Sequence, residues 1–406
     1  MDIIKTAEKE IKEQFEKIDE IKEFNQEKVL EAFKKNKIGA EHFSYVSGYG
    51  HDDLGREALD NLFKDIFKAE KAVVRNHFVS GTHALSCALM GNLHSGDTLV
   101  SLAGAPYDTM EEVIGKRGES ELSLIKNGVK YSEVPLKDGI SIDYDAISKY
   151  VKKNTKMVLI QRSRGYSQRN SLTIADIEKA IIIIKTINPD CICFVDNCYG
   201  EFVEKKEPLE VGADIIAGSL IKNPGGGIVE TGGYVAGKEK YVSNAAQRLT
   251  APGIGEWGGS MLNQTRLIMQ GVFIAPSIVA DAVKGVVLMS KVFENLGFDT
   301  HPKSTDLRTD IIQTVAFRDK EKLINFCKAI QENSPIDSYV TPIPDDVPGY
   351  EDKLIMAGGT FIEGSTIELS ADGPLRDPYA VYIQGGLNYA HIKIALKKAL
   401  EKILTK

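Results

Sequence analysis

Lys222 stands where a lysine side chain can act as a nucleophile. In 'SLIKNPGGGIVETGGY', positions 219 to 234, it ends an apolar run and is followed at once by Asn, Pro and three glycines. An amine removed from water has a lowered pKa and becomes reactive toward carbonyl groups. The glycines allow the backbone to pass close to a bound group. Taken alone, however, Lys222 is one lysine among many.

Ser80, Gly81 and Thr82 in 'HFVSGTHAL' are placed to bind an anion. They follow one apolar run and begin a helical one, and the free amides of a first helical turn, with two hydroxyls, suit a phosphate group. Ser80 also fits an ordinary helix N-cap. No G-x-G-x-x-G follows an expected strand, and no G-x-x-x-x-G-K-[ST] occurs, so this is neither a dinucleotide fingerprint nor a P-loop.

Tyr107 and Asp196 also follow apolar runs, in 'AGAPYDTMEEV' and 'CICFVDNCYGEF'. A tyrosine ring there can lie over a flat heteroaromatic ligand, although half-buried tyrosines are common. A carboxylate at the inner end of an apolar strand needs a partner, because burying an unpaired charge is costly. The cationic ring nitrogen of a ligand would be such a partner. A helix N-cap and a structural salt bridge are the alternatives for Asp196.

These residues share a position at the ends of expected strands. From about Glu70, short apolar strands alternate with helices, and the strand runs are continuous rather than alternating. Such runs are typical of parallel strands covered on both faces, so we predict a doubly wound α/β sheet, whose ligands bind at the carboxyl ends of the strands. The expected strands are 71–76, 97–103, 156–163, 191–197 and 213–222, and the expected helices are 80–93 and 173–188.

The two ends of the chain differ from its middle in their pattern of apolar and polar residues. Apolar residues from Ile3 to Ile21 fall at helical spacing, which predicts an amphipathic helix. A long helical pattern covers 274–298, followed by a strand at 311–317, a helix at 320–333, a Pro-rich linker at 341–353, a strand-like stretch at 360–371 and a helix at 385–404. We expect an N-terminal helical arm (1–60), a large α/β domain (61–285) and a small α+β domain (286–406).

The composition excludes several classes of protein. The chain has 406 residues, 43% of them hydrophobic, and a net charge of -7, which argues against nucleic-acid or anionic-membrane partners. It has no run of eighteen apolar residues, and its N-terminus does not read as a secretory signal. The five cysteines favour a reducing cytoplasm. Cys191 and Cys193 are expected to be buried hydrophobic residues rather than metal ligands, since the sequence has no second pair of Cys or His residues at ligand spacing.

The candidate residues describe one cofactor when they are taken together. A phosphate cradle, a stacking ring, an acid for a ring nitrogen and an amine for an aldehyde are the requirements of pyridoxal 5'-phosphate (PLP). Ser219, which precedes Lys222 at the same strand end, adds a further hydroxyl. Each component is common, but the ordered set is not, so the residues themselves favour a PLP site.

The sequence also resembles the fold-type-I PLP enzymes of the Cys/Met-metabolism group, and more closely the methionine gamma-lyase-like proteins often labelled cystathionine beta-lyase or aluminium-resistance proteins. The resemblance implies an aspartate-aminotransferase-like fold, with a mostly parallel doubly wound sheet and a smaller C-terminal α+β domain. It also implies a homodimer or homotetramer with sites at the interface. It rests on 'GYGHDDLGREALD', 'VSGTHAL', 'PYDTMEEVIG', 'FVDNCYGEF', 'SLIKNPGGGIVETGGY' and 'GPLRDPYAVYIQGGL', which span positions 48 to 387.

The resemblance assigns a role to each candidate residue. Lys222 would hold PLP covalently, Asp196 would pair with its pyridine nitrogen, and Tyr107 would stack on its ring. Tyr49 would reach the phosphate in a neighbouring subunit, and Arg376 would bind the substrate carboxylate. The expected phosphate ligands are Ser80, Gly81, Thr82 and Ser219.

The chain departs from the family pattern in three places. Related enzymes have an aromatic or small residue after the lysine, whereas Lys222 is followed by Asn223 and Pro224. Related enzymes carry Tyr-x-Arg near the N-terminus, whereas Tyr49 is followed by Gly50 and His51. The segment 'QRSRGYSQR' replaces a Ser-Asn-Pro loop, which makes Arg162 or Arg164 a candidate for phosphate or carboxylate binding.

The resemblance implies a carbon-sulfur lyase. Elimination at Cβ or Cγ of a sulfur amino acid would give a keto acid, ammonia and a thiol. An aminotransferase and a PLP-binding protein without turnover remain alternatives. A nicotinamide oxidoreductase is disfavoured, because the glycine fingerprint follows none of the expected strands.

Overall fold

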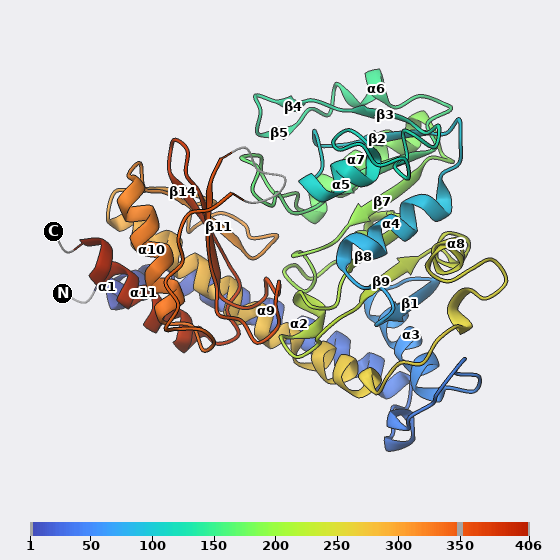
Figure 1. Cartoon of the computed structure of the whole chain (residues 1–406), viewed down its shortest axis with the longest axis horizontal. Helices are drawn as coiled ribbons and strands as arrows, with labels where there is room; N and C mark the ends of the chain where they lie inside the picture. Colours follow the sequence, from blue (N-terminus) through green and yellow to red (C-terminus); the bar gives the residue numbers. More distant parts are fainter. Residues whose placement is uncertain (1–2, 347–351, 405–406) are drawn as a thin grey trace. The chain divides into compact units, whose positions relative to one another are not determined.

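The chain forms two compact units, each with its own main sheet (Figure 1). The computed structural model describes residues 3–346 and 352–404. The large unit comprises Glu27–Leu220 and Val229–Gln270. The small unit comprises Met1–Gln26, Ile221–Ile228 and Gly271–Lys406.

The main sheet of the large unit has seven strands in the order β1-β9-β8-β7-β6-β2-β3. Strands β3, β2, β6, β7 and β8 run parallel to one another, and β9 runs antiparallel to both β8 and β1. The mostly parallel order confirms the predicted fold class. The strands are β1 (Lys71–Arg75), β2 (Thr98–Ser101), β3 (Lys130–Glu133), β6 (Met157–Gln161), β7 (Ile192–Asp196), β8 (Ile215–Ser219) and β9 (Gly233–Gly237).

Helices pack on both faces of this sheet, as a doubly wound fold requires. On one face, α4 (Gly81–Asn92), α5 (Asp108–Ile114) and α8 (Glu239–Leu249) share an apolar cluster with strand residues such as Val235. On the other face, Tyr234 stacks on Phe67 of α3 (Leu54–Phe67), with ring centroids 5.2 Å apart. The remaining elements are η1 (Ala40–Phe43), β4 (Leu136–Lys137), β5 (Ser141–Ile142), α6 (Ile147–Tyr150), α7 (Ile174–Ile187), η2 (Pro208–Val211) and η4 (Gly255–Trp257).

The small unit has an antiparallel sheet of five strands in the order β10-β11-β14-β13-β12. Asp319 caps its helix α10, because its carboxylate accepts hydrogen bonds from the backbone N of Glu321 and Lys322. This arrangement is the α+β type expected for the C-terminal part of the chain. The elements are β10 (Asp299–His301), β11 (Ile312–Ala316), α10 (Lys320–Glu332), β12 (Leu354–Ala357), β13 (Ser370–Pro374), β14 (Ala380–Gln384), α11 (Tyr389–Leu404) and η3 (Asn223–Gly225).

The N-terminal helical pattern forms two helices, α1 (Ile3–Glu10) and α2 (Lys12–Lys35). Ala7, Ile11 and Ile18 are buried, as the amphipathic spacing predicts. Glu8 of α1 binds two residues of α11, since its Oε1 accepts from Tyr389 Oη at 2.8 Å and from Lys393 Nζ at 2.6 Å. The first helix is therefore part of the packed small unit.

Helix α9 (Gln264–Asn295) is the longest helix in the described part of the chain. Among the described residues it alone has the length and composition to cross a membrane, with a mean hydropathy of 1.9 over its most apolar window. Yet 67% of that window is buried inside the protein. Core helices of soluble proteins show the same combination of apolar composition and burial.

The strand predicted from the stretch 360–371 is wrong over most of its length. Only the last two of these residues belong to β13, and the others form a loop. The reason is local hydrogen bonding: the buried Glu368 carboxylate accepts from the backbone N of Phe361 and Ile362, both at 3.0 Å. These bonds fold the segment back on itself and take up amides that a strand ladder would need.

Candidate active site

Three parallel strands of the large unit bring polar side chains to one edge of the sheet. In the register, Gln161 at the end of β6 lies opposite Asp196 at the end of β7, and Asp196 lies opposite Ala217 of β8. Ser219 is two residues beyond Ala217 and ends β8. Because side chains alternate along a strand, Gln161, Asp196 and Ser219 belong to the same face.

The first turn of α4 lies against the end of β8. Ser80 is the N-cap, and its hydroxyl accepts from the backbone N of His83 at 3.1 Å. A Cβ on Gly81 would lie 2.9 Å from Cβ of Ser219, so only glycine fits there. The helix N-terminus and the Ser219 hydroxyl are therefore neighbours.

The Ser219 hydroxyl is buried and makes no hydrogen bond to any residue that the structure describes. A buried hydroxyl without a partner is costly, so it points to a bound group. An anion with several oxygen atoms would satisfy this hydroxyl together with the free amides of α4. The residues present therefore fit a phosphate group.

Tyr107 is fixed at both ends beside this cradle. Its phenol oxygen lies 2.8 Å from the hydroxyl oxygen of Thr82, and its backbone N donates to Oε1 of Gln161 at 2.8 Å. Burial, together with the Asp196 carboxylate, raises the pKa of Tyr107 well above its ordinary value. The phenol therefore keeps its proton at neutral pH and is available as a donor.

Asp196 is buried at the end of β7, as the sequence predicts. Its Oδ1 accepts from the backbone N of Cys198 at 3.1 Å. The structure thus brings six predicted residues together at one edge of the large unit, namely Ser80, Gly81, Thr82, Tyr107, Asp196 and Ser219.

Gln161 is a member of this group that the sequence reading missed. It ends the apolar run 'MVLIQ', and its side chain holds the backbone of Tyr107 in place while Nε2 donates to the carbonyl of Ser163 at 2.7 Å. The signal was present, because Gln161 is a polar residue at a strand end like Asp196.

Of the two loop arginines, Arg162 is engaged with protein groups. Its guanidinium donates to Oδ1 of Asn197 at 2.9 Å and to Oε1 of Glu204 at 3.0 Å, and its side chain is fully buried. These contacts leave it poorly suited to bind a substrate. Arg164 is buried in the loop after β6, where its backbone N donates to the hydroxyl of Ser171 at 3.1 Å.

Lys222 lies in the small unit, three residues after Ser219 along the chain. Its side chain is part-buried, and Nζ donates to the hydroxyl of Thr366 at 3.4 Å. Thr366 was also missed, because it lies in the stretch taken for a strand. The glycines after Lys222 pack on the protein itself: a Cβ on Gly226 would lie 2.6 Å from the carbonyl oxygen of Gly271.

Tyr49 is not part of the group at the sheet edge. It is 65% exposed, and its ring stacks on that of His51 with centroids 6.1 Å apart. Its carbonyl accepts from Arg56 at 3.5 Å. Arg376 of the small unit is also exposed and pairs with Asp352 at 3.3 Å.

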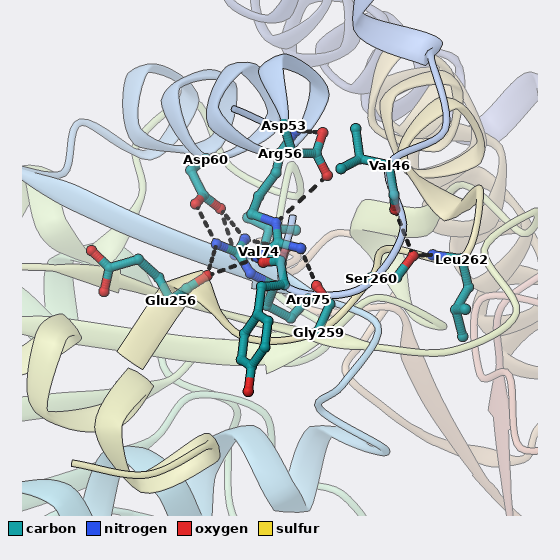
Figure 2. A network of polar contacts seen from close by, with 11 residues as sticks. Val46, Asp53, Arg56, Asp60, Val74, Arg75, Glu256, Gly259, Ser260 and Leu262 are labelled. Atoms are coloured by element: carbon teal, nitrogen blue, oxygen red, sulfur yellow. Dashed lines mark hydrogen bonds and ion pairs between the residues drawn. The ribbon is translucent and has the colours of Figure 1, made fainter. Parts of the chain in front are cut away.

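Two arginines of the large unit, Arg56 and Arg75, donate to backbone carbonyls within residues 256–259 (Figure 2). Arg56 donates to the carbonyls of Glu256 and Gly259, and Arg75 pairs with Asp60 at 2.7 Å. Ser260 then donates to the carbonyl of Val46 at 2.8 Å. The segment that carries Tyr49 is thus tied to residues 256–260.

Comparisons with known proteins agree with this geometry. The sequence profile described as methionine gamma-lyase matches residues 1–404. A solved structure from Listeria monocytogenes, named as a candidate cystathionine beta-lyase involved in aluminium resistance, is 50% identical and has a TM-score of 0.97, with 99% of each chain covered. The uncharacterized protein YnbB of Bacillus subtilis is 49% identical over 391 residues, which are 96% of this chain and 93% of that protein.

A more distant likeness shows the fold alone. An enzyme from Campylobacter jejuni, named as a candidate O-acetylhomoserine (thiol)-lyase and solved with a pyridoxyl-lysine monophosphate, is 16% identical and has a TM-score of 0.58, with 85% of this chain and 86% of that chain covered. The architecture is thus that of fold-type-I PLP-dependent enzymes, and the match over nearly its full length means that the chain belongs to the methionine gamma-lyase family.

Proposed function

We propose that the chain is a PLP-dependent carbon-sulfur lyase that acts on a sulfur amino acid. The reaction is a β- or γ-elimination that consumes one water and releases a keto acid, ammonia and a thiol. The observation that carries the cofactor assignment is the buried Ser219 hydroxyl without a partner beside Gly81. Membership of the methionine gamma-lyase family and the name of the Listeria relative support the reaction type.

The residues at the sheet edge match the groups of PLP one by one. Asp196 binds the pyridine nitrogen, and Tyr107 covers the ring. Lys222 provides the amine that holds the aldehyde, since three residues of chain after Ser219 span at most about 10 Å. The phosphate ligands are Ser80, Gly81, Thr82 and Ser219.

Bound PLP supplies an electron sink for the bond that breaks at the α-carbon of the amino acid. Once the amine of the substrate has replaced it at the aldehyde, the freed Lys222 Nζ would take the α-proton of the substrate and return a proton later. The Tyr107 phenol, which stays protonated, is a hydrogen-bond donor in the site. It can pass its proton to the departing sulfur. Arg376 and Arg164 are the proposed carboxylate ligands.

We also propose that the enzyme works in the cytoplasm as a homodimer or homotetramer. Tyr49 supports this proposal, because an exposed ring on a fixed segment is suited to reach the phosphate in a second copy of the chain. No nucleic-acid or membrane partner is proposed.

The test begins with the purified protein and its visible spectrum after addition of PLP. Borohydride reduction followed by peptide mapping should place the modified lysine at 222. L-Cystathionine, L-methionine and L-cysteine are then assayed for keto-acid and thiol release. A label on another amine contradicts the site, and stoichiometric conversion of PLP to its amine form by these substrates without thiol release identifies an aminotransferase. A PLP spectrum unchanged by all three contradicts the lyase assignment.

A further inference from the structure

A buried polar cluster lies on the opposite side of the strand ends from the candidate site. It consists of Arg162, Asn197, Glu201, Glu207 and Tyr234, each of which is 0% exposed. All five belong to the large unit. The cofactor chemistry proposed above uses none of them.

The position of Arg162 and Asn197 follows from the register of β6 and β7. Backbone bonds continue the sheet one residue past each strand: Arg162 N donates to the carbonyl of Asp196 at 3.1 Å, and Asn197 N donates to that of Ala217 at 3.1 Å. Adjacent side chains alternate between faces. Gln161 and Asp196 therefore face the site, and Arg162 and Asn197 face away from it.

The two side chains are joined behind the site. Arg162 Nη1 donates to Oδ1 of Asn197 at 2.9 Å, and Asn197 Nδ2 donates to Oε2 of Glu207 at 3.0 Å. Asn197 Nδ2 also lies 3.4 Å from Oη of Tyr234, which donates to Oε1 of Glu201 at 2.8 Å. The ends of β6, β7 and β9 are thereby tied together.

The same cluster folds the loop that follows Asp196. Oε1 of Glu207 accepts from the backbone N of Phe202 at 3.0 Å. Gly200 lies flat on Arg162, because a Cβ there would be 2.5 Å from Cδ of the arginine. The loop is thus wrapped around the guanidinium, and it presents the backbone N of Cys198 to the Asp196 carboxylate at 3.1 Å.

We infer that Arg162 is a positioning residue for the cofactor site. It holds the groups of that site in place through its contacts with Asn197 and the loop 198–207. The inference rests on the proposed function, because the site in question is the cofactor site proposed above. Arg162 holds Asp196 and Gln161 of that site in register. A planar guanidinium is suited to this task because it reaches Asn197 and two carboxylates at once, whereas an ammonium group bonds from a single point. Arg162 acts on PLP only through these neighbours.

The test compares Arg162→Met with Asp214→Asn. Asp214 is a matched control: it is buried, it accepts from Cys193 N at 2.8 Å and from Lys185 at 2.7 Å, and it precedes β8 at the amino end of the same sheet. Both variants should lose stability to urea. Only Arg162→Met should weaken PLP binding, by tenfold or more in the dissociation constant.

Amide hydrogen exchange without cofactor gives a second readout. In Arg162→Met the amides of Cys198 and Tyr107 should exchange faster than in the wild type, and in Asp214→Asn they should not. Arg162→Lys should lie between the wild type and Arg162→Met. If Arg162→Met does not fold, Asn197→Ala, which leaves the arginine on its carboxylates, should show the same changes at smaller size.

The outcomes separate the two proposals. If the wild type does not bind PLP, the proposed function fails, and amide exchange alone still decides whether Arg162 positions the site. If the wild type binds PLP and Arg162→Met keeps its affinity and its amide protection, the positioning role is wrong. Equal weakening of PLP binding by Asp214→Asn would also refute it, because a general loss of stability would then explain both variants.

Discussion

The hydroxyl oxygens of Thr82 and Tyr107 lie 2.8 Å apart, which joins the first turn of α4 to the residue that precedes α5. Thr82→Val should cost about 1–3 kcal/mol in the free energy of unfolding, because it leaves the part-buried phenol without this partner. Tyr107→Phe in the same background should recover part of that loss. Urea unfolding of both single variants and the double variant measures the coupling, and strictly additive effects would contradict the bond.

Ser219→Ala should weaken PLP binding without lowering the stability of the unliganded protein. The hydroxyl has no partner among the described residues, so its removal should leave the stability of the unliganded protein unchanged or slightly higher. A hydrogen bond to a charged group contributes about 1.5–3 kcal/mol, so PLP affinity should fall by roughly 10- to 100-fold. Fluorescence titration with PLP and urea unfolding check the two parts. Loss of stability without loss of affinity would show that the hydroxyl serves the fold instead.

Asp196→Asn should affect turnover more than cofactor content. A charge pair across a few ångströms at an effective dielectric near 20 is worth about 4 kcal/mol, so the variant should lose roughly a thousandfold in kcat/KM for keto-acid release. The absorbance of the variant with PLP shows that the site is filled during the assay. A variant with near-normal kcat/KM would argue against a charged pyridine nitrogen beside Asp196.

Glu201 should make stability depend on pH. Burial raises the pKa of Glu201 from 4.5 to about 8 in the folded protein. Below pH 4.5 the group is protonated in both states; as pH rises toward 8 only the unfolded state ionises, so stability is lost over this window and levels off above it.

Glu201→Gln should remove this dependence, because the amide stays neutral at every pH. The variant should be close to the wild type at pH 5 and more stable than it at pH 9. Denaturant unfolding at pH 5, 7 and 9 measures the difference. The same pH slope in both proteins would mean that Glu201 is ionised in the folded state.

The sequence allowed β1, β2, β6, β7 and β8 to be placed because each contains a continuous apolar run. The parallel strand β3 was not predicted, since its sequence 'KYSE' is mostly polar. Strand β9 was also not predicted; in 'GYVAG' two glycines flank a short apolar segment. The prediction of a strand over 360–369 was wrong. The deciding bonds to Glu368 are made by a side chain, and a pattern of residue types does not show them.

The same limit applies to the site. Residues at strand ends could be listed from the sequence, because the fold class fixes where such ends meet. The proposed positioning role of Arg162 could not be predicted, because an arginine beside a strand suggests a ligand-binding residue. Its contacts with Asn197 and Glu204 are seen only in the structure. Thr366 lies 144 positions from Lys222, and only the folded chain brings them together.

Strand β9 returns alongside β8, and Leu220 N donates to the carbonyl of Gly232 at 2.9 Å, so the residues between them form an excursion closed at its base. A closed excursion explores far fewer shapes than an open chain. The positions that the Lys222 side chain can reach are therefore restricted as soon as the sheet assembles, before any ligand binds. Part of the conformational entropy of the Lys222 segment is therefore lost during folding, so less is lost when a ligand binds.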